Sequence, residues 1–461
     1  MNGTSNISKS TIIKWIVNIG LPLVVFLIPC GEVYTMQMKL FFVTTLFAIC
    51  AFALETMDQT GVAILLPVTW VFLGVAQPGV IFGPWSQYIA WVTLGGFFLA
   101  NVLQRVGLLS RFVYWVVSKT GVNYRGIVLG LAVAVMLLTQ FTGEHPMLIA
   151  TICYGICMAF GFGVSKASAG IMLTGAASTI IANQFRFTGP INVIGVANSA
   201  GFQLNLLGFV ESWFYNLPII LFWLGTVIMI LLMFKPEKDI EGKTYFEEKL
   251  AEMGKMTLDE KKALAVLVIF MGYVLTQKIH GLSLEWGMAI IPWLLLFPGI
   301  GCAKPEDVKK INYGMVFFMI TCMGIGSVAT SLGIGKILTG IAAPLLTGKS
   351  VYVLFITIWF IMFICNFAMT PLAMIAAFSV PLLTLAESFG VNPMAICYFM
   401  ITSFDQIILP YEYAKYLMFF GFGLISMKDF MKFGVGKSIL NFIICFAVLI
   451  PWWMITGFLY V

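Results

Sequence analysis

Apolar stretches separated by short polar connections follow one another along almost the whole chain. About 20 mostly apolar residues are enough to cross a lipid bilayer as a helix. Such stretches begin near Ile12, Leu40, Gly61, Trp85, Gly126, Met147, Ala169, Gly208, Ala263, Gly287, Gly314, Val351, Met374, Met394, Tyr416 and Ser438. They are too many to be full spans in a chain of 461 residues. We therefore expect about 11 transmembrane helices, with the other stretches folded as re-entrant hairpins or lying along the membrane surface.

Two of the apolar stretches are interrupted by polar residues and a proline. The interruptions are Gln140–Pro146 and Asn366–Pro371. Irregular backbone at membrane depth has to be buried in protein or line a cavity. We expect each interruption to be the tip of a re-entrant hairpin, near 135–165 and near 355–388, and a first candidate for function.

A second interruption follows each hairpin, inside the apolar regions 170–200 and 394–424. The polar segments are Ser178–Asn192 and Thr402–Lys415, and both contain proline. Proline frees backbone groups inside a helix. Freed N–H groups attract an anion, and freed C=O groups coordinate a cation. Two broken helices would thus build one anion site flanked by cation sites.

The two halves of the chain resemble each other at a constant shift. Gly107 and Gly333 are 226 residues apart, and the same shift carries Gln140-Phe141 onto Asn366-Phe367. Each Phe is followed within five residues by a proline. Repeats with matching breaks are typical of secondary transporters, which bind substrate where broken helices meet. An odd number of spans in each half would make the two repeats inverted.

The longest polar stretch, 235–262, contains seven lysines and eight acidic residues. We interpret it as a cytoplasmic linker between an N-terminal half, 1–234, and a C-terminal half, 263–461, with one repeat each. Further cations cluster at Arg105, Arg111, Lys119 and Arg125, at Lys304, Lys309 and Lys310, and at Lys428, Lys432 and Lys437, whereas Lys39, Lys278, Lys336 and Lys349 are isolated. Placing the clusters inside satisfies the positive-inside rule. The N-terminus would then be cytoplasmic and the C-terminus outside.

The composition excludes a soluble fold. Hydrophobic residues make up 60% of the chain and charged residues 10%, and the mean hydropathy is +0.99. An average soluble domain has about 25% charged residues, so the excess apolar surface has to face lipid. The net charge of +6 suits a membrane protein better than nucleic-acid binding. Two histidines and the lack of a phosphate-binding G-x-x-x-x-G-K-[ST] motif argue against an enzyme and an ATP-driven pump.

Charged residues occur in or beside the interruptions. They are Glu144, Arg186, Asp405, Glu412 and Lys415. A charge at membrane depth costs about 2.5–3.5 kcal/mol on insertion scales. These residues would therefore either contact the substrate or a coupling ion, or pair with one another and only stabilise the broken helices. His145 is either a proton relay or a loop residue that faces water.

Three motifs carry a resemblance to a known family. Glu55–Pro67 ends in Ala-Ile-Leu-Leu-Pro, Ala176-Ala-Ser178 precedes Thr188-Gly-Pro-Ile-Asn192, and Leu409-Pro410 precedes Phe420-Gly-Phe-Gly and Ile425-Ser-Met-Lys-Asp429. In this order, over nearly the whole chain, they resemble motifs of the divalent anion:sodium symporters. That family carries citrate, succinate, tartrate, malate or sulfate. The resemblance implies a homodimer of elevator-type transporters, each with a scaffold domain and a transport domain holding the hairpins and broken helices.

The hairpin tips depart from the family pattern. The family has Ser-Asn-Thr at each tip, where the side chains contact the substrate carboxylates and help to bind sodium. The matching places here read Thr139-Gln140-Phe141 and Cys365-Asn366-Phe367, so only Asn366 is retained. The second Thr-Pro-Pro-Asn of the family is replaced by Tyr413-Ala-Lys415-Tyr416. We expect Lys415, and Arg186 in the first broken helix, to stand in for sodium ions, which would turn a symporter into an exchanger.

These features predict an all-α membrane protein of the cell membrane that moves a small anion, a dicarboxylate, by secondary active transport. The expected substrate-binding residues are Thr139, Gln140, Phe141, Thr142, Arg186, Thr188, Gly189, Pro190, Asn192, Cys365, Asn366, Phe367 and Lys415. Oxygen-bearing candidates for Na+ are Thr139, Gln140, Ser178 and Asn366, and candidates for coupling are Glu144, Asp405 and Glu412. No cofactor other than Na+ as coupling ion is expected, and no nucleic-acid partner. Sodium-independent exchange, transport of sulfate or another oxyanion, a membrane-embedded enzyme and a channel stay open.

Overall fold

The computed structural model describes residues 9–32, 34–54, 56–120, 123–236, 243–299, 301–334, 350–367 and 370–460. Within these ranges the chain is helical, with no β-strand. Glu55, Lys336 and Lys349 lie outside them. The predicted all-α class is therefore confirmed for the described part of the chain.

The chain forms two compact units, and each unit draws segments from both halves of the sequence. The first unit comprises Met1–Ala90, Ile191–Asn205 and Asn312–Cys397, and the second comprises Trp91–Pro190, Leu206–Ile311 and Tyr398–Val461. The predicted boundaries between halves at 235–262 describe the order of the repeats along the chain, and they stay a prediction.

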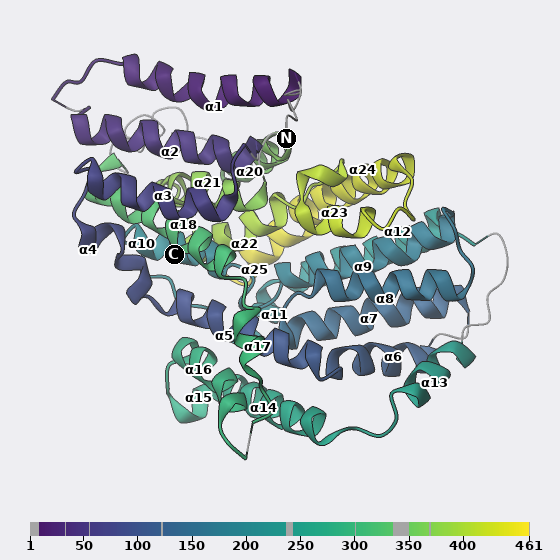
Figure 1. Cartoon of the computed structure of the whole chain (residues 1–461). Coiled ribbons are helices and arrows are strands. Elements are labelled where there is room, and N and C mark those ends of the chain that lie inside the picture. The colour runs from purple at the N-terminus through teal and green to yellow at the C-terminus, as the bar shows by residue number, and fades with distance from the viewer. Residues whose placement is uncertain are drawn as a thin grey trace, which may run out of the picture. The chain divides into compact units, whose positions relative to one another are not determined.

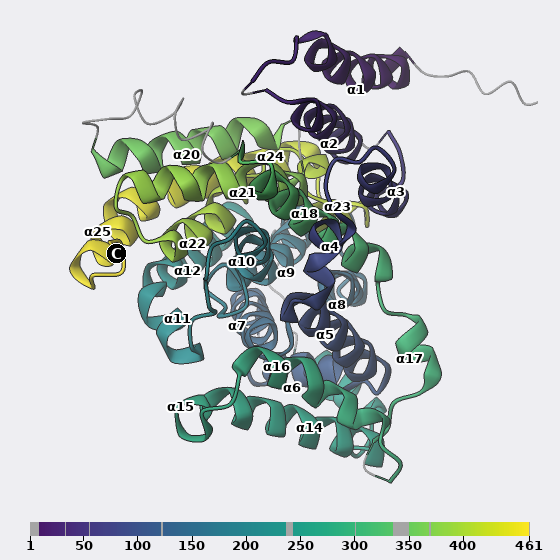
Figure 2. The same cartoon turned by 90° about the vertical axis from the view of Figure 1, so that its left-hand side faces the viewer.

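The first unit contains α1, α2, α3, α10, α18, α20 and α21 as its longer helices. Their bounds are Lys9–Leu27, Met36–Leu54, Gln59–Phe72, Ile191–Ser199, Tyr313–Ser331, Val351–Asn366 and Pro371–Ser388, with the short α4 at Pro78–Ile81 and η1 at Gly83–Ser86. Helix α2 packs between α1 and α3, and α18 contacts α3, α10 and α21 (Figures 1 and 2). The indole N–H of Trp70 donates to the hydroxyl of Thr44 at 3.0 Å and joins α3 to α2.

The second unit is built around α9, Lys166–Gln184. Helices α7 (Tyr124–Thr142), α8 (Pro146–Ala159) and α12 (Leu217–Met233) pack against it (Figure 1). Every residue from Ala167 to Ala182 is buried. Small side chains such as those of Gly, Ala and Ser let helices approach closely in membrane proteins, and α9 is rich in them.

The remaining helices of the second unit include short surface segments as well as long apolar ones. They are α6 (Leu108–Thr120), α11 (Phe209–Tyr215), α13 (Lys243–Glu252), α14 (Leu258–Leu275), α15 (Gln277–His280), α16 (Leu284–Ile290), η2 (Ile291–Leu296), α17 (Pro305–Lys309), η3 (Pro410–Glu412), α23 (Ala414–Phe420), α24 (Met427–Ile444), η4 (Cys445–Leu449) and α25 (Ile450–Ile455). Helices α5 (Tyr88–Arg105) and α22 (Pro393–Ser403) continue from the first unit into the second.

Four helices of the described residues are long and apolar enough to cross a membrane, or up to six if each of two bent pairs is one span. The four are Tyr124–Thr142, Tyr313–Ser331, Pro371–Ser388 and Met427–Ile455, and the bent pairs are α5 with α6 and α11 with α12. Shorter apolar helices such as α3 and α8 accompany them. The chain is therefore a multi-pass membrane protein, and about 11 spans remain a prediction.

Two ion pairs tie polar loops to one end of the second unit. Arg105 at the end of α5 binds Asp307 of α17 with 2.8 Å between Nε and Oδ1. Arg111 of α6 binds Glu260 at the start of α14 with 2.7 Å between Nε and Oε1. Three of the polar clusters that the sequence assigned to one membrane side thus lie at the same end of this unit.

The predicted position of Lys437 at the membrane surface is wrong. Lys437 was counted with the cations at the membrane surface, but its side chain is completely buried on α24. The reason is Asp405, which follows α22 and is equally buried. A buried carboxylate needs a charged partner, and Lys437 supplies it.

Candidate functional site

The predicted tip of the first hairpin is the three-residue turn between α7 and α8. Helix α7 ends at Thr142, and the N–H of Gly143 caps it by donating to the Thr139 carbonyl at 3.1 Å. Gly143 has φ +92, which favours glycine. A Cβ built on Gly143 would lie 3.3 Å from Nη1 of Arg186. The tip therefore packs directly on the guanidinium of the first broken helix.

The first break is the non-helical segment that follows α9. Helix α9 ends at Gln184, and α10 begins after Pro190. The turn is held by the N–H of Gly189, which donates to the Arg186 carbonyl at 2.8 Å. A Cβ on Gly189 would lie 2.1 Å from the Asn183 carbonyl, so only glycine fits. The buried hydroxyl of Thr188 has no hydrogen-bond partner.

Phe209 of α11 connects the hairpin tip with the break. Its ring stacks on Phe141 at 6.2 Å between centroids and meets Phe187 edge-on at 5.8 Å. Aromatic pairs at such distances fix the orientation of the elements that carry them. Phe141, which the sequence predicted to contact substrate, thus packs on protein.

Gln140 and Gln184 hold the end of α9 by their side-chain amides. The amide of Gln140 donates to the Ala182 carbonyl, and that of Gln184 donates to Oδ2 of Asp405 at 2.7 Å. Both amide oxygens are buried without a hydrogen-bond partner. Three oxygen atoms near the C-terminal end of α9, those of the two amides and of the Thr188 hydroxyl, therefore have no hydrogen-bond donor among the described residues.

The second break contains a sealed ion pair. Nζ of Lys437 lies 3.0 Å from Oδ1 of Asp405, and the two side chains are 0% and 1% exposed. The same ammonium donates to the backbone carbonyl of Asp405 and, at 2.8 Å, to the hydroxyl of Tyr416. Glu412 accepts hydrogen bonds from the N–H groups of Ile408 and Leu409 at 3.1 and 2.9 Å. Asp405 and Glu412 therefore both have structural partners.

Glu144 and Lys415 form a second ion pair, which joins the hairpin tip to the start of α23. Their side chains are 18% and 22% exposed, so the pair is partly open. Nζ of Lys415 also lies 5.1 Å from the centre of the Tyr413 ring. Pairing among the charged residues at the breaks was one of the two expectations from the sequence, and the structure pairs Lys415 with Glu144.

Arg186 has no ion pair with any carboxylate of the described residues. Its Nε is buried and without a hydrogen-bond partner. The nearest aromatic contact is Phe187, with 5.9 Å between the guanidinium carbon and the ring centre. An arginine side chain offers five N–H donors, which match a carboxylate or another oxyanion. The positive charge of Arg186 is thus not paired with a carboxylate in the described part of the chain, and a bound anion could pair with it.

His145 is not the water-facing loop residue that was one of two expectations. Its side chain is 7% exposed, and Nε2 lies 2.9 Å from the hydroxyl of Thr142. Thr142 also donates to the Leu138 carbonyl at 2.9 Å. Both side chains thus stabilise the turn at the hairpin tip.

The other predicted site residues lie apart from this group or in the other unit. Ser178, in the middle of α9, accepts from the indole N–H of Trp223 at 3.1 Å. Asn192, Cys365, Asn366 and Phe367 belong to the first unit. Asn366 ends α20, is 1% exposed, and has no partner for either polar side-chain atom. A buried amide without partners is costly, so Asn366 is a candidate ligand-binding group.

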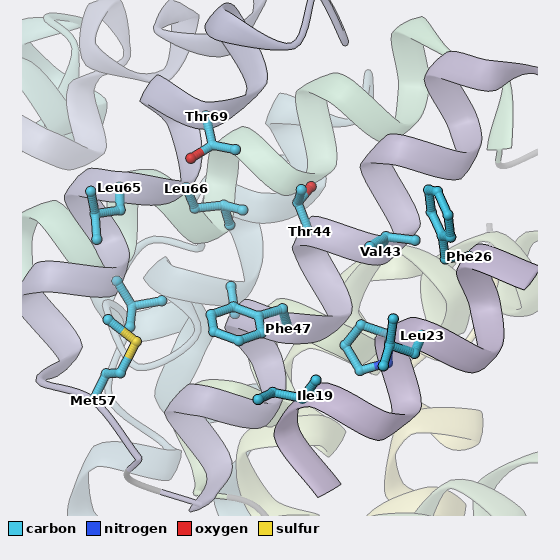
Figure 3. A pocket seen from close by; sticks show the side chains of 13 residues that line it. Ile19, Leu23, Phe26, Val43, Thr44, Phe47, Met57, Leu65, Leu66 and Thr69 are labelled. Atoms are coloured by element: carbon cyan, nitrogen blue, oxygen red, sulfur yellow. The ribbon is translucent and has the colours of Figure 1, made fainter. Parts of the chain in front are cut away.

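The first unit also contains a pocket of about 570 Å³ between α1, α2 and α3 (Figure 3). Ile19, Leu23, Phe47 and Leu66 are among its lining side chains, and the only polar ones are Thr44 and Thr69. Since no lining residue is charged, this pocket does not suit an anion.

The sequence did not predict three residues that surround Asp405, namely Lys437, Gln184 and Tyr416. Lys437 follows Asp405 by 32 residues, and no spacing in the sequence shows that α24 turns it toward the break. The only usable signal was its setting, because Lys437 stands between the apolar residues Val435 and Ile439. A lysine inside an apolar helix is costly unless it is paired.

The described helices define a multi-pass membrane protein with charged residues at breaks in apolar segments. A family model for the sodium:sulfate symporter transmembrane region matches residues 9–459. The chain therefore belongs to the divalent anion:sodium symporter family, as its motifs predicted.

Similar proteins agree with this membership. The inner membrane protein YbhI of Escherichia coli (strain K12) is 22% identical over 97% of this chain and 98% of its own length. The sodium-dependent dicarboxylate transporter SdcS of Staphylococcus aureus (strain USA300) is 23% identical over 83% of this chain and 80% of its own. The crystal structure of the Alcanivorax borkumensis YdaH transporter, described as having an unusual topology, matches with a TM-score of 0.53 at 14% identity, covering 98% and 99% of the two chains. It supports the fold alone.

Proposed function

We propose that this protein carries a small dianion, a dicarboxylate of the succinate and malate class, across the cell membrane by secondary active transport. The observation that carries the proposal is Arg186, a partly buried guanidinium in a broken helix beside a hairpin tip, with no acidic partner among the described residues. An unpaired charge is expensive at membrane depth. A bound carboxylate would neutralise it. The name of SdcS supports a dicarboxylate over sulfate.

Different residues would bind different parts of the substrate. Arg186 would bind one carboxylate by paired hydrogen bonds, and Lys415, whose side chain is 22% exposed, would bind the other. Thr188 would donate its hydroxyl, which has no partner in the structure. Gly189 and Pro190 would shape the turn that presents these groups.

Sodium is the proposed coupling ion. Na+ is a hard cation and takes oxygen ligands, as other hard cations do. The buried amide oxygens of Gln140 and Gln184 have no donor. They lie at the C-terminal end of α9, where the helix dipole favours a cation. These two amide oxygens are the proposed ligands of the sodium ion, and Thr139 of α7 and Ser178 of α9 are further candidates.

Sodium-independent exchange is the second candidate, and one observation favours it. At the second break the ammonium of Lys437 already contacts a backbone carbonyl, a carboxylate and a hydroxyl. These are the oxygen groups that a sodium ion would use, so a fixed cation occupies that place. Brisk counterflow of labelled succinate in sodium-free potassium buffer would favour exchange, and strict dependence on a sodium gradient would favour symport.

The proposed role of Arg186 is tested by binding of labelled succinate to the purified protein. We expect Arg186→Gln to weaken binding by 10-fold or more, because a hydrogen bond to a charged group contributes about 1.5–3 kcal/mol. Its folding stability should change little, since the guanidinium has no ion pair to lose. Arg105→Gln is the matched control. It breaks the pair with Asp307 and should lower stability while leaving affinity unchanged. Equal affinity of wild type and Arg186→Gln would remove Arg186 from the site.

A further inference from the structure

The two ion pairs at the breaks differ in access to solvent. The Lys437–Asp405 pair is sealed, with side chains 0% and 1% exposed, whereas Lys415 and Glu144 keep 22% and 18% of their surfaces. The sealed ammonium has three oxygen contacts. Glu144 contacts Lys415 through Oε2, and its Oε1 is buried without a hydrogen-bond partner among the described residues. The Glu144 pair is therefore the one that an incoming anion can open.

Glu144 also lies next to the other cation of the proposed site. Its neighbour Gly143 packs so closely on Arg186 that a Cβ there would be 3.3 Å from Nη1. The carboxylate of Glu144 attracts the Arg186 guanidinium electrostatically but forms no ion pair with it. The carboxylate of Glu144 thus forms an ion pair with Lys415 and attracts Arg186 from a longer distance.

The charges around the breaks are balanced only because Glu144 is present. The carboxylates are Glu144, Asp405 and Glu412, and the cations are Arg186, Lys415 and Lys437. Without Glu144 the group would carry one excess positive charge. Moving an uncompensated charge through the membrane interior is unfavourable. An empty carrier with Glu144 in place can return across the membrane more easily than one without it.

We propose that Glu144 is a tethered carboxylate that occupies the anion site of the empty carrier and is displaced from Lys415 by a carboxylate of the substrate. This inference rests on the proposed function. The substrate carboxylate binds Lys415, and the freed side chain of Glu144 turns toward solvent. Glu144 thereby lowers the affinity for the anion and permits net transport, because the empty site is neutral.

The test compares net uptake with counterflow for Glu144→Gln in proteoliposomes, using labelled succinate. We expect the variant to bind succinate about 5- to 10-fold more tightly, because the competing carboxylate is gone. Uptake into vesicles without internal anion should fall by about 10-fold relative to counterflow, since an excess charge of one slows the empty carrier. Glu144→Asp keeps the charge and should keep net uptake. Glu252→Gln, a change at a carboxylate that is 63% exposed, is the matched control.

The outcomes separate this inference from the proposed function. If wild-type protein neither binds nor transports succinate or another dicarboxylate, the proposed function fails. If wild type transports succinate and Glu144→Gln leaves both the affinity and the ratio of net uptake to counterflow unchanged, the tethered carboxylate is wrong. Weaker binding in a well-folded Glu144→Gln protein would also overturn it, because Glu144 would then support the anion rather than compete with it.

Discussion

At the scale of single residues, the site is a set of charges that differ in how fully they are paired. Lys437 and Asp405 form an ion pair out of contact with solvent. Lys415 and Glu144 pair at a partly open position, and Arg186 has no acidic partner in the described part of the chain. Buried pairs are poor evidence for function, because they can be purely structural. Incomplete pairing is therefore the better guide to where substrate binds.

Asn366 allows a prediction that separates binding from folding. Because both its polar atoms are buried without partners, Asn366→Ala should leave the stability of the empty protein unchanged or raise it. The same change should weaken succinate binding by about 10-fold or more. Thermal unfolding and a binding isotherm on one preparation measure both. Asn198→Ala is the control. The side-chain amide of Asn198 donates to the carbonyl of Leu204 and accepts from its N–H, both at 2.8 Å, so this variant should be less stable. Unchanged affinity in Asn366→Ala would mean that Asn366 is not a ligand.

Lys437 should behave as a structural residue. Removing one member of a buried pair costs about 3–5 kcal/mol, because the other charge stays buried alone. We expect Lys437→Met to lower the unfolding midpoint strongly, and the double change with Asp405→Leu to recover much of the loss. Lys428→Met, at an exposed position on the same helix, should have little effect. A Lys437→Met protein as stable as wild type would refute a sealed ion pair.

At the scale of elements, the breaks were predictable and the partners of their side chains were not. Polar residues with Gly and Pro inside apolar stretches predicted irregular backbone, and the structure has turns at Gly143 and at Gly189. Local sequence sets such features. The contact of Lys437 with Asp405 depends on how α24 is rotated and packed, which no local pattern encodes. The same holds for Phe141, whose ring packs on Phe209 of a distant helix.

The membrane sides of the connecting segments give an element-scale prediction. The ion pairs of Arg105 and Arg111 place the 243–262 region and the 304–310 loop at one end of the second unit, which the positive-inside rule assigns to the cytoplasm. Gly242 lies outside the described residues, so Lys255, which is exposed, is the better position for a probe. With Cys30→Ser as background, Lys255→Cys should react with an impermeant maleimide only after cells are opened.

Cys30 of the unmodified protein tests the other side of the membrane. It is exposed in the segment after α1, which the predicted topology places outside the cell. Wild-type protein should therefore be labelled at Cys30 in intact cells. Labelling of Lys255→Cys in intact cells, or of Cys30 only in opened cells, would reverse the topology.

At the scale of the whole molecule, each compact unit combines segments from both halves of the chain. The predicted first hairpin and the breaks after α9 and α22 belong to the second unit. The described residues of the predicted second hairpin belong to the first unit, and residues 368 and 369 at its tip lie outside the described ranges. The family match over residues 9–459 includes segments of both units. The homodimer and the elevator-type movement of a transport domain against a scaffold are implied by the family, and they stay predictions for this chain.

The most direct test of the central claim is uptake of labelled succinate, malate, citrate, tartrate and sulfate into proteoliposomes, with and without an inward sodium gradient. We expect saturable uptake of a dicarboxylate that is driven by the sodium gradient, is inhibited by other dicarboxylates, and is at least 10-fold weaker at low substrate concentration in Arg186→Gln. Uptake of none of these anions by well-folded protein, or a flux that rises linearly with concentration and shows no counterflow, would contradict it.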